Sequence, residues 1–423
     1  MSRLRLSANR GGRSAGVPPA RFVSAGTRGW DTRAPAGASP GGTPGGRRQA
    51  GTPAPLHCGV LALVALLLFP FLLGAANAPA AAPKPDRVDA AVARAVAYLL
   101  SAQDKDGSIN APDNRQNYNH AMTALSVMAL AAVGHQPADK SPEGLALRRA
   151  LDFLLRPMPD GSDRTPYPGY LGGYDASRMY GHGIITLALT EMLGMGMDKR
   201  QDGALRDRCQ KAVDLILRSQ RSKKYDPRFF GGWRYTPESP DADLSVSVWQ
   251  VMALRSAKNA GMAVPKEAID AAVGFLKRSY DAPRDATGQA TSGKGGCSYT
   301  PGQPTHFAMA AAGLLALQVC GQHDSPEAAG SAGWLRERRL SYDEKWFFYG
   351  TYYYAQGMHK RGGDFAATAR ETTEQLLLSR QNPDGSWLGN DGQERGLAGK
   401  VYCTALAVLS LSVKHHFLPI YQE

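Results

Sequence analysis

Two kinds of helical run alternate between residues 88 and 420. The first kind is amphipathic and carries charges on one face, as in 149-RALDFLLRP-157 and 211-KAVDLILRSQ-220. The second kind is almost wholly apolar and rich in alanine, as in 306-HFAMAAAGLLALQVCG-321. No segment alternates apolar and polar residues with the period of two that a half-buried strand requires. The pattern therefore predicts an all-α protein built from helical hairpins.

The hairpin is written six times along the chain. The first helices carry a bulky side chain at an equivalent place, at successive intervals of 55, 62, 60, 59 and 42 residues. These side chains are Tyr98, Phe153, Leu215, Phe275, Trp334 and Leu376. The second helices are predicted over 120–134, 182–196, 243–257, 306–321, 346–357 and 402–413. Such a period is typical of a repeat architecture, in which each unit buries its apolar face against its neighbours.

The difference between the two kinds of helix predicts how the hairpins assemble. A wholly apolar helix must be buried, whereas an amphipathic helix keeps one face in solvent, so the second helices are expected inside and the first helices outside. An open stack would need polar capping repeats at its ends. The first and last units instead carry the most regular loops, 103-QDKDGSI-109 and 381-QNPDGSW-387. We therefore expect closure into an (α/α)6 toroid of twelve helices over residues 88–420.

The two regular loops are predicted to be structural joints. Asp384 can cap a turn, and Gly385 can adopt a positive φ that other residues avoid. Gln381 is expected to bond to the backbone of the next hairpin, and Trp387 to cover the end of the outer helix. The matching residues of the first loop have the same expected roles, except that Ile109 stands where the last loop has tryptophan.

The spacing of Tyr98, Gln103 and Gly107, and of Gln381, Gly385 and Trp387, resembles the QW repeat of the squalene cyclase and protein prenyltransferase superfamily. Ile109 and Leu376 depart from it, because an aromatic residue is typical at both places. The chain looks most like bacterial exported proteins with prenyltransferase/squalene oxidase repeats, which also carry segments similar to 231–235 and 418–422. The resemblance covers residues 88–420 and implies the α/α toroid.

Candidate site residues recur with the period of the repeat. His120, His182, Asp243 and His306 are separated by 62, 61 and 63 residues, each near the start of a second helix. A ring of parallel inner helices would bring these starts to one mouth. The same mouth is expected to carry further polar or aromatic side chains, namely Asn119, Tyr180, Trp233, Asp241 and Tyr402. Two interpretations stay open, which do not exclude each other: the residues cap helices and anchor loops, or they contact a ligand.

No metal or cofactor is predicted at this mouth. Inner helices pack about 8–10 Å apart, so positions on opposite sides of a six-membered ring cannot converge on one ion. The prenyltransferases that the chain resembles bind zinc through an Asp-x-Cys pair and a later histidine. Here 295-GGCSYTP-301 lacks the aspartate, and Cys403 stands where the histidine would be expected.

Three functions are compatible with the sequence. The first is a non-catalytic protein that binds an extended ligand, apolar or polymeric, or a segment of a cell-envelope protein. The second is a squalene- or hopene-type terpenoid cyclase, because 241-DADLS-245 resembles the Asp-x-Asp-Asp-Thr motif, with Asp243 as the general acid and Asp241 beside it; Leu244 replaces the last acid of that motif. The third is a toroidal polysaccharide lyase, for which 117-NYNH-120 and 180-YGH-182 supply the residue types. The aromatic run 346-WFFYGTYYY-354 is predicted to be core rather than a sugar platform.

The N-terminal part is predicted to lie outside the toroid. Residues 1–55 have the composition of a disordered tail, and they hold nine arginines and one acid, so +8 of the formal +12 charge belongs to this tail. The basic charge is therefore no argument for nucleic acid. The apolar block 58–73, followed by 74-GAANA-78, predicts a signal peptide or membrane anchor over 56–78, with membrane association through 58–76 if it is retained. Residues 79–87 are predicted to be a linker, the protein to be exported to the periplasm or anchored facing it, and Cys209, Cys297, Cys320 and Cys403 to be isolated thiols.

Overall fold

The computed structural model describes residues 86–111, 118–157, 167–288, 290–291, 293, 295–390, 392–415 and 417–422. The predicted tail, the signal or anchor and residues 79–85 of the linker lie outside these residues. Twelve α-helices follow one another in the described part: α1 (Arg87–Ser101), α2 (Asn119–Ala132), α3 (Pro142–Leu155), α4 (Arg178–Glu191), α5 (Lys199–Gln220), α6 (Leu244–Asn259), α7 (Lys266–Arg278), α8 (Phe307–Val319), α9 (Pro326–Glu337), α10 (Phe347–Arg361), α11 (Gly363–Leu378) and α12 (Gly399–Leu411).

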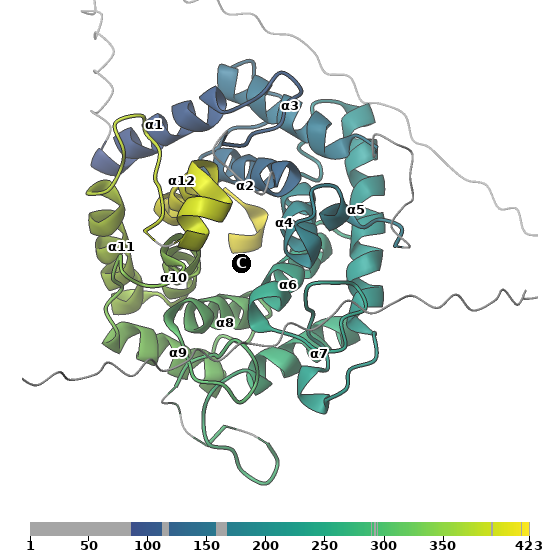
Figure 1. Cartoon of the computed structure of the whole chain (residues 1–423), viewed down its shortest axis with the longest axis vertical. Coiled ribbons are helices and arrows are strands. Elements are labelled where there is room, and N and C mark those ends of the chain that lie inside the picture. The colour runs from purple at the N-terminus through teal and green to yellow at the C-terminus, as the bar shows by residue number, and fades with distance from the viewer. Residues whose placement is uncertain are drawn as a thin grey trace, which may run out of the picture. The chain divides into compact units, whose positions relative to one another are not determined.

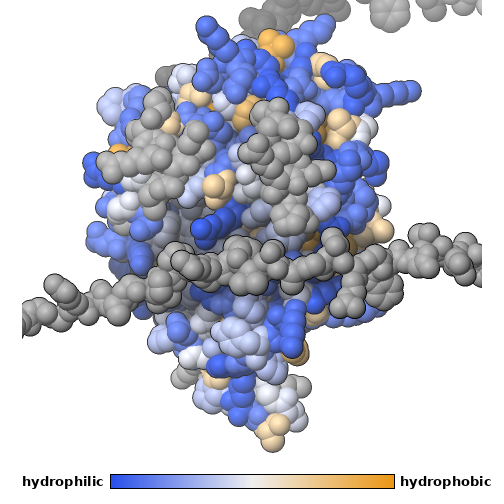
Figure 2. Space-filling view, turned by 45° about the vertical axis from the view of Figure 1, so that its right-hand side comes forward, coloured by the Kyte–Doolittle hydropathy of each residue, from blue (hydrophilic) through white to orange (hydrophobic). Residues whose placement is uncertain are grey.

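The helices form two concentric rings (Figure 1). The even-numbered helices make the inner ring and the odd-numbered helices surround it, as the apolar and amphipathic patterns predict. Every residue of α8 is buried, whereas α7 buries five residues on one stripe. The face shown in Figure 2 is accordingly mostly hydrophilic, with scattered apolar residues. The all-α toroid is confirmed, and within the described residues no helix is long and apolar enough to cross a membrane.

Glutamines at or just after the ends of three outer helices join each of these helices to the next outer helix. The side-chain amide of Gln103 donates to the carbonyl of Ala146 in α3 at 2.8 Å. Gln220 makes the same bond to a carbonyl of α7. Gln381 donates to the carbonyl of Ala91 in α1 at 2.8 Å, so the last hairpin is bonded to the first. The expected role of these glutamines is confirmed, and it closes the ring.

The glycine and the tryptophan of the last loop complete this joint. Gly385 has a φ of +85°, and a Cβ built on it would lie 2.4 Å from the carbonyl oxygen of Arg94 in α1. The loop can therefore dock on the first helix only because this residue has no side chain. The Trp387 indole donates to the carbonyl of Leu377 at 2.9 Å, at the end of α11. The tryptophan thus covers the outer helix end, as predicted.

Aromatic side chains fill the centre of the inner ring. Trp249 of α6 stacks on Tyr352 of α10, with ring centroids 5.9 Å apart and planes 9° from parallel. Tyr353 contacts both rings edge-on or at a tilt, and all three side chains are buried. The prediction that the aromatic run of α10 is core is confirmed.

The C-terminal segment is held in the middle of the ring (Figure 1). The amide of Ile420 donates to one carboxyl oxygen of Glu191 at 3.1 Å, and the hydroxyl of Ser256 donates to the other at 2.5 Å. The hydroxyls of Tyr421 and Tyr352 are hydrogen-bonded to each other. Glu191, at the end of α4, therefore anchors this segment at the C-terminal ends of the inner helices.

This buried anchor predicts a pH-dependent stability. Burial raises the pKa of Glu191 to about 7 from its ordinary 4.5. As pH rises, the Glu191 carboxyl loses its proton in the unfolded chain before it does so in the folded protein. The contribution of Glu191 to the free energy of unfolding should therefore fall as pH rises from 4.5 to 7. In Glu191→Gln this loss is absent, so the variant should gain about 3 kcal/mol relative to the wild type across that interval. Urea denaturation at pH 4.5, 6 and 8 measures the difference; a constant difference would contradict the assignment.

Candidate functional site

The N-terminal ends of the inner helices meet at the opposite end of the ring from the C-terminal segment. Free amides at a helix start need acceptors. In four of the inner helices, an amide near the start of the helix donates to an acceptor in the loop that precedes the next inner helix along the chain. The pairs are Ala121 with the carboxylate of Asp175, Met179 with the carbonyl of Tyr235, Leu244 with the carbonyl of Tyr299, and Phe348 and Tyr349 with the carboxylate of Glu394.

Asp243 is a fully enclosed acid at this mouth. It is the N-cap of α6, and one carboxyl oxygen accepts from the amide of Val246 and the hydroxyl of Ser245, each at 2.8 Å. The other oxygen accepts from the Tyr299 hydroxyl at 3.0 Å and lies 3.4 Å from Nε of Arg234. The side chain is 0% exposed. Burial raises the pKa of the Asp243 carboxyl, and these four donors oppose the rise.

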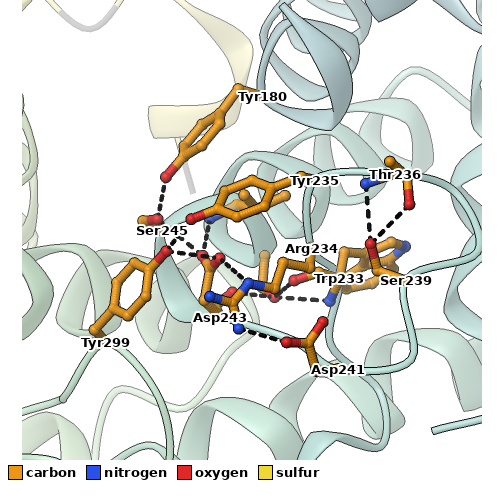
Figure 3. Close-up of polar contacts among 12 residues, drawn as sticks. Tyr180, Trp233, Arg234, Tyr235, Thr236, Ser239, Asp241, Asp243, Ser245 and Tyr299 are labelled. Carbon is orange, nitrogen blue, oxygen red and sulfur yellow. Dashed lines mark hydrogen bonds and ion pairs between the residues drawn. The ribbon is translucent and has the colours of Figure 1, made fainter. Parts of the chain in front are cut away.

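Arg234 links Asp243 to Asp241 (Figure 3). Its Nη1 lies 2.6 Å from a carboxyl oxygen of Asp241, and both side chains are about a quarter exposed, at 23% and 24%. The guanidinium also lies 5.1 Å from the ring centroid of Tyr235 and 5.7 Å from that of Tyr299. The neighbouring acids and Tyr235 raise the pKa of Arg234 against the effect of burial, so the guanidinium is a fixed cation.

Three half-buried tyrosines surround this ion pair. The hydroxyls of Tyr235 and Tyr299 are hydrogen-bonded to each other, and Tyr180 is hydrogen-bonded to Ser245 (Figure 3). The rings of Tyr180 and Tyr235 are 6.1 Å apart and tilted by 31°. Burial raises the pKa of Tyr180 and of Tyr299, so both phenols stay neutral. The mouth therefore presents aromatic rings, phenol hydroxyls and one partly exposed Arg–Asp pair. We call this whole group the Arg234 cluster; its members are Tyr180, Arg234, Tyr235, Asp241, Asp243 and Tyr299.

The geometry gives no support to the terpenoid-cyclase alternative. An acid that protonates an alkene must be kept protonated and must face a pocket that the substrate can enter. Although burial raises the pKa of Asp243, its side chain is 0% exposed and four donors of the protein occupy its two carboxyl oxygens, so no substrate can reach the acid. The aromatic side chains that would line such a pocket, such as Trp249 and Tyr352, pack on one another in the ring centre.

The three predicted histidines do not gather around Asp243. His182 is fully buried; its Nδ1 accepts from the amide of Leu171, and its Nε2 lies 3.2 Å from the carbonyl of Ala212 in α5. Both ring nitrogens therefore contact the protein backbone, one at Leu171 before α4 and the other at Ala212 in α5. Burial lowers the pKa of His182 to about 3. His120 packs against Phe153 of α3, with ring centroids 4.5 Å apart. His306 is an exposed N-cap residue of α8 whose side chain makes no capping bond.

The other predicted site residues have structural contacts. Asn119 begins α2 and accepts a hydrogen bond from Asn110. Trp233 is 0% exposed and donates to the carbonyl of Ile216. Trp387 makes the equivalent bond in the last loop, to the carbonyl of Leu377. Tyr402 is buried in α12, where burial raises its pKa well above the ordinary value.

Neither a metal site nor a disulfide is present in the described part of the chain. No group of three or more His, Cys, Asp or Glu residues there could hold an ion. All four cysteines between Cys209 and Cys403 have free thiols.

Sequence reasoning missed Arg234, Tyr235 and Tyr299 as members of the cluster. A signal was present, because the loops 231-GGWRYTP-237 and 295-GGCSYTP-301 place a tyrosine before Thr-Pro at an interval of 64 residues. These tyrosines follow the same period as the histidines. Their backbone carbonyls cap α4 and α6, and their hydroxyls meet each other.

The comparisons with known proteins address the fold. No family model matches the chain, and no curated protein matches it. Among solved structures, the GH76A alpha-1,6-mannanase from Salegentibacter sp. HEL1_6 is 10% identical with a TM-score of 0.54, and the match covers 78% of this chain and all of that one. A wild-type glycosidase is 13% identical with a TM-score of 0.46, and the match covers 78% of this chain and 98% of that one. The mannanase shares the α/α toroid with this chain.

Proposed function

We propose that this protein binds a neutral, hydroxyl-rich polymer, a glycan, at the Arg234 cluster, and that it acts outside the cytoplasm. The observation that carries the proposal is the combination of half-buried tyrosine rings with an exposed edge of the Arg234–Asp241 pair. Amphipathic rings offer an apolar face together with a polar tip. A few fixed polar groups beside them can orient the hydroxyls of a sugar.

Charge argues for a neutral ligand. Four of the six helix N-termini at the mouth have amides that donate to carbonyls or carboxylates of the next hairpin, so their positive dipole ends already face acceptors of the protein. One guanidinium and two carboxylates give Arg234, Asp241 and Asp243 a formal charge of −1. A phosphate or uronate would be repelled by the acids, which also disfavours the polysaccharide lyase alternative.

Binding is a better proposal than hydrolysis. Glycoside hydrolysis ordinarily uses two carboxyl groups on either side of the scissile bond. Asp243 is enclosed, which leaves Asp241 as the carboxyl of the pair that reaches solvent. The mannanase of the same fold makes a mannan the first glycan to test. Membership of the squalene cyclase and prenyltransferase superfamily stays a proposal, supported by the QW-type contacts of Gln381 and Trp387.

Isothermal titration of the full-length protein tests the proposal. The probes are an α-1,6-linked mannan, a neutral β-1,4-linked glucan and anionic polygalacturonate. We expect a neutral glycan to bind, and Asp241→Ala and Tyr235→Phe each to weaken binding about tenfold, or 1.4 kcal/mol. Asp207→Ala, on the exposed face of α5, is the matched control and should leave binding unchanged.

Three results would contradict the proposal or part of it. One is the absence of binding to either neutral glycan. Another is binding that Asp241→Ala leaves unchanged, which would place the ligand elsewhere. Preferential binding of polygalacturonate would refute the charge argument.

A further inference from the structure

A cleft separates α11 from the inner helices α10 and α12, three helices that lie side by side (Figure 1). Its volume is about 220 Å³. The outer helices α1 and α7 direct large aliphatic or aromatic residues inward, such as Val92 and Leu99 of α1 or Phe275 of α7. The corresponding face of α11 has small residues, including Ala366 and Thr373. This local shortage of side-chain volume leaves the space.

The cleft holds a buried polar group without a partner. Thr373 lines it and is 2% exposed, and its hydroxyl has no hydrogen-bond partner within the described part of the chain. An unsatisfied buried hydroxyl costs about 1 to 3 kcal/mol. Such a group is retained at a cost to stability unless a ligand or solvent satisfies it.

The walls of the cleft are mainly apolar, with contributions from Ala355, Leu411 and Val413. At its rim, basic side chains lie close to acidic ones. Lys414 is paired with Asp86 and Asp89 at 2.9 and 2.6 Å.

The remaining ionisable side chains of the lining are Arg370, Glu374 and His359. Arg370 and Glu374 are four residues apart on one face of α11, so their charges offset each other. The lining therefore favours neither an anion nor a cation.

We infer that this cleft is a second binding site, for a small neutral amphiphile with a short hydrocarbon chain and one hydrogen-bonding group that meets Thr373. The size agrees with this class. A cavity of about 150 Å³ holds benzene, so by proportion this cleft holds roughly nine non-hydrogen atoms. A medium-chain alcohol such as 1-octanol has that size, and its hydroxyl can accept from or donate to the threonine.

The test measures 1-octanol binding to the full-length protein by NMR line broadening of the alcohol, with octanoate and octylamine as charged probes of equal chain length. We expect 1-octanol to bind at least fivefold more tightly than either ion. Thr373→Val should weaken 1-octanol binding about fivefold while raising the melting temperature of the unliganded protein, because the unpaired hydroxyl is gone. Thr372→Val is the matched control: that hydroxyl bonds to the Thr368 carbonyl, and 1-octanol affinity should be unchanged.

Filling the cleft gives a second, independent result. Ala366→Phe should abolish 1-octanol binding, and Ala366→Leu serves the same purpose if the larger variant does not fold. Equal affinity in the filled variant, or a lower melting temperature in Thr373→Val, would overturn the inference. If filling the cleft abolished dimerisation of the protein, the occupant would be a second copy of the chain, and the inference would be overturned. If 1-octanol bound only after removal of residues 1–79, the occupant would be the chain's own N-terminal segment, with the same consequence.

Discussion

Replacing Gly385 by alanine is expected to lower the free energy of unfolding by about 3 kcal/mol or more, because it breaks the joint between the last hairpin and the first. The backbone of Gly385 has a φ of +85°, which costs an L-residue about 1–2 kcal/mol. The added Cβ would also lie 2.4 Å from the carbonyl oxygen of Arg94, so loop and helix must separate, at a further 1–3 kcal/mol. Separation also stretches the bond from Gln381 to Ala91.

Gly321→Ala is the matched control for this prediction. Gly321 has a similar φ of +74°, but a Cβ there would meet no atom within 4 Å. Gly321→Ala should therefore lose only the backbone contribution, about 1–2 kcal/mol. Urea denaturation of the two variants measures the difference, and equal losses would mean that the last loop does not close the ring as described.

Asp243→Ala is expected to destabilise the protein by about 2 to 4 kcal/mol, because a lost cap costs about 1 kcal/mol and a buried hydroxyl left without its partner costs about 1 to 3 kcal/mol. The change removes the N-cap of α6 and leaves the Tyr299 hydroxyl and Nε of Arg234 without their acceptor. Asp243→Asn should lose less, about 1 to 2 kcal/mol, since its amide oxygen can still accept from Val246.

Asp198→Ala separates the capping term from the burial term. Asp198 is also an N-cap, and it accepts from the amide of Gln201 at 2.8 Å, but it is exposed. Its loss should cost about 1 kcal/mol. If thermal and urea unfolding give the same loss for Asp198→Ala and Asp243→Ala, Asp243 is an ordinary cap and the Arg234 cluster has no special stability.

The ring could be predicted from sequence because two patterns agree: the apolar inner helices demand burial, and the regular loops recur in the first and last hairpins. Gln381 then bonds to α1 as Gln103 bonds to α3. The contact depends on main-chain acceptors, which every helix offers, so the loop sequence alone is sufficient to predict it.

The period of the repeat does not predict where the histidine side chains point. The interval of about sixty residues fixes the repeat but not where a residue lies relative to its helix start. Asp243 precedes α6, whereas His182 is the fifth residue of α4. At about 100° per residue, five residues turn a side chain by roughly 140° from the starting direction, which directs His182 to the outer ring.

The members of the Arg234 cluster come from loops whose path the helical pattern does not specify. Tyr235 and Tyr299 are brought together by the carbonyl bonds that their loops make to Met179 and Leu244. These bonds cross from one hairpin to another, and they form only once the inner helices stand side by side. Arg234 then finds Asp241 and Asp243 within reach.

A crystal structure of the full-length protein with an α-1,6-linked mannohexaose tests the proposed site most directly. Sugar density is expected at the N-terminal mouth of the inner ring, with one pyranose against the Tyr180 and Tyr235 rings and a hydroxyl about 3 Å from the Asp241 carboxylate. Sugar bound at another face, or a mouth without sugar at a concentration that saturates binding in solution, would contradict the proposal.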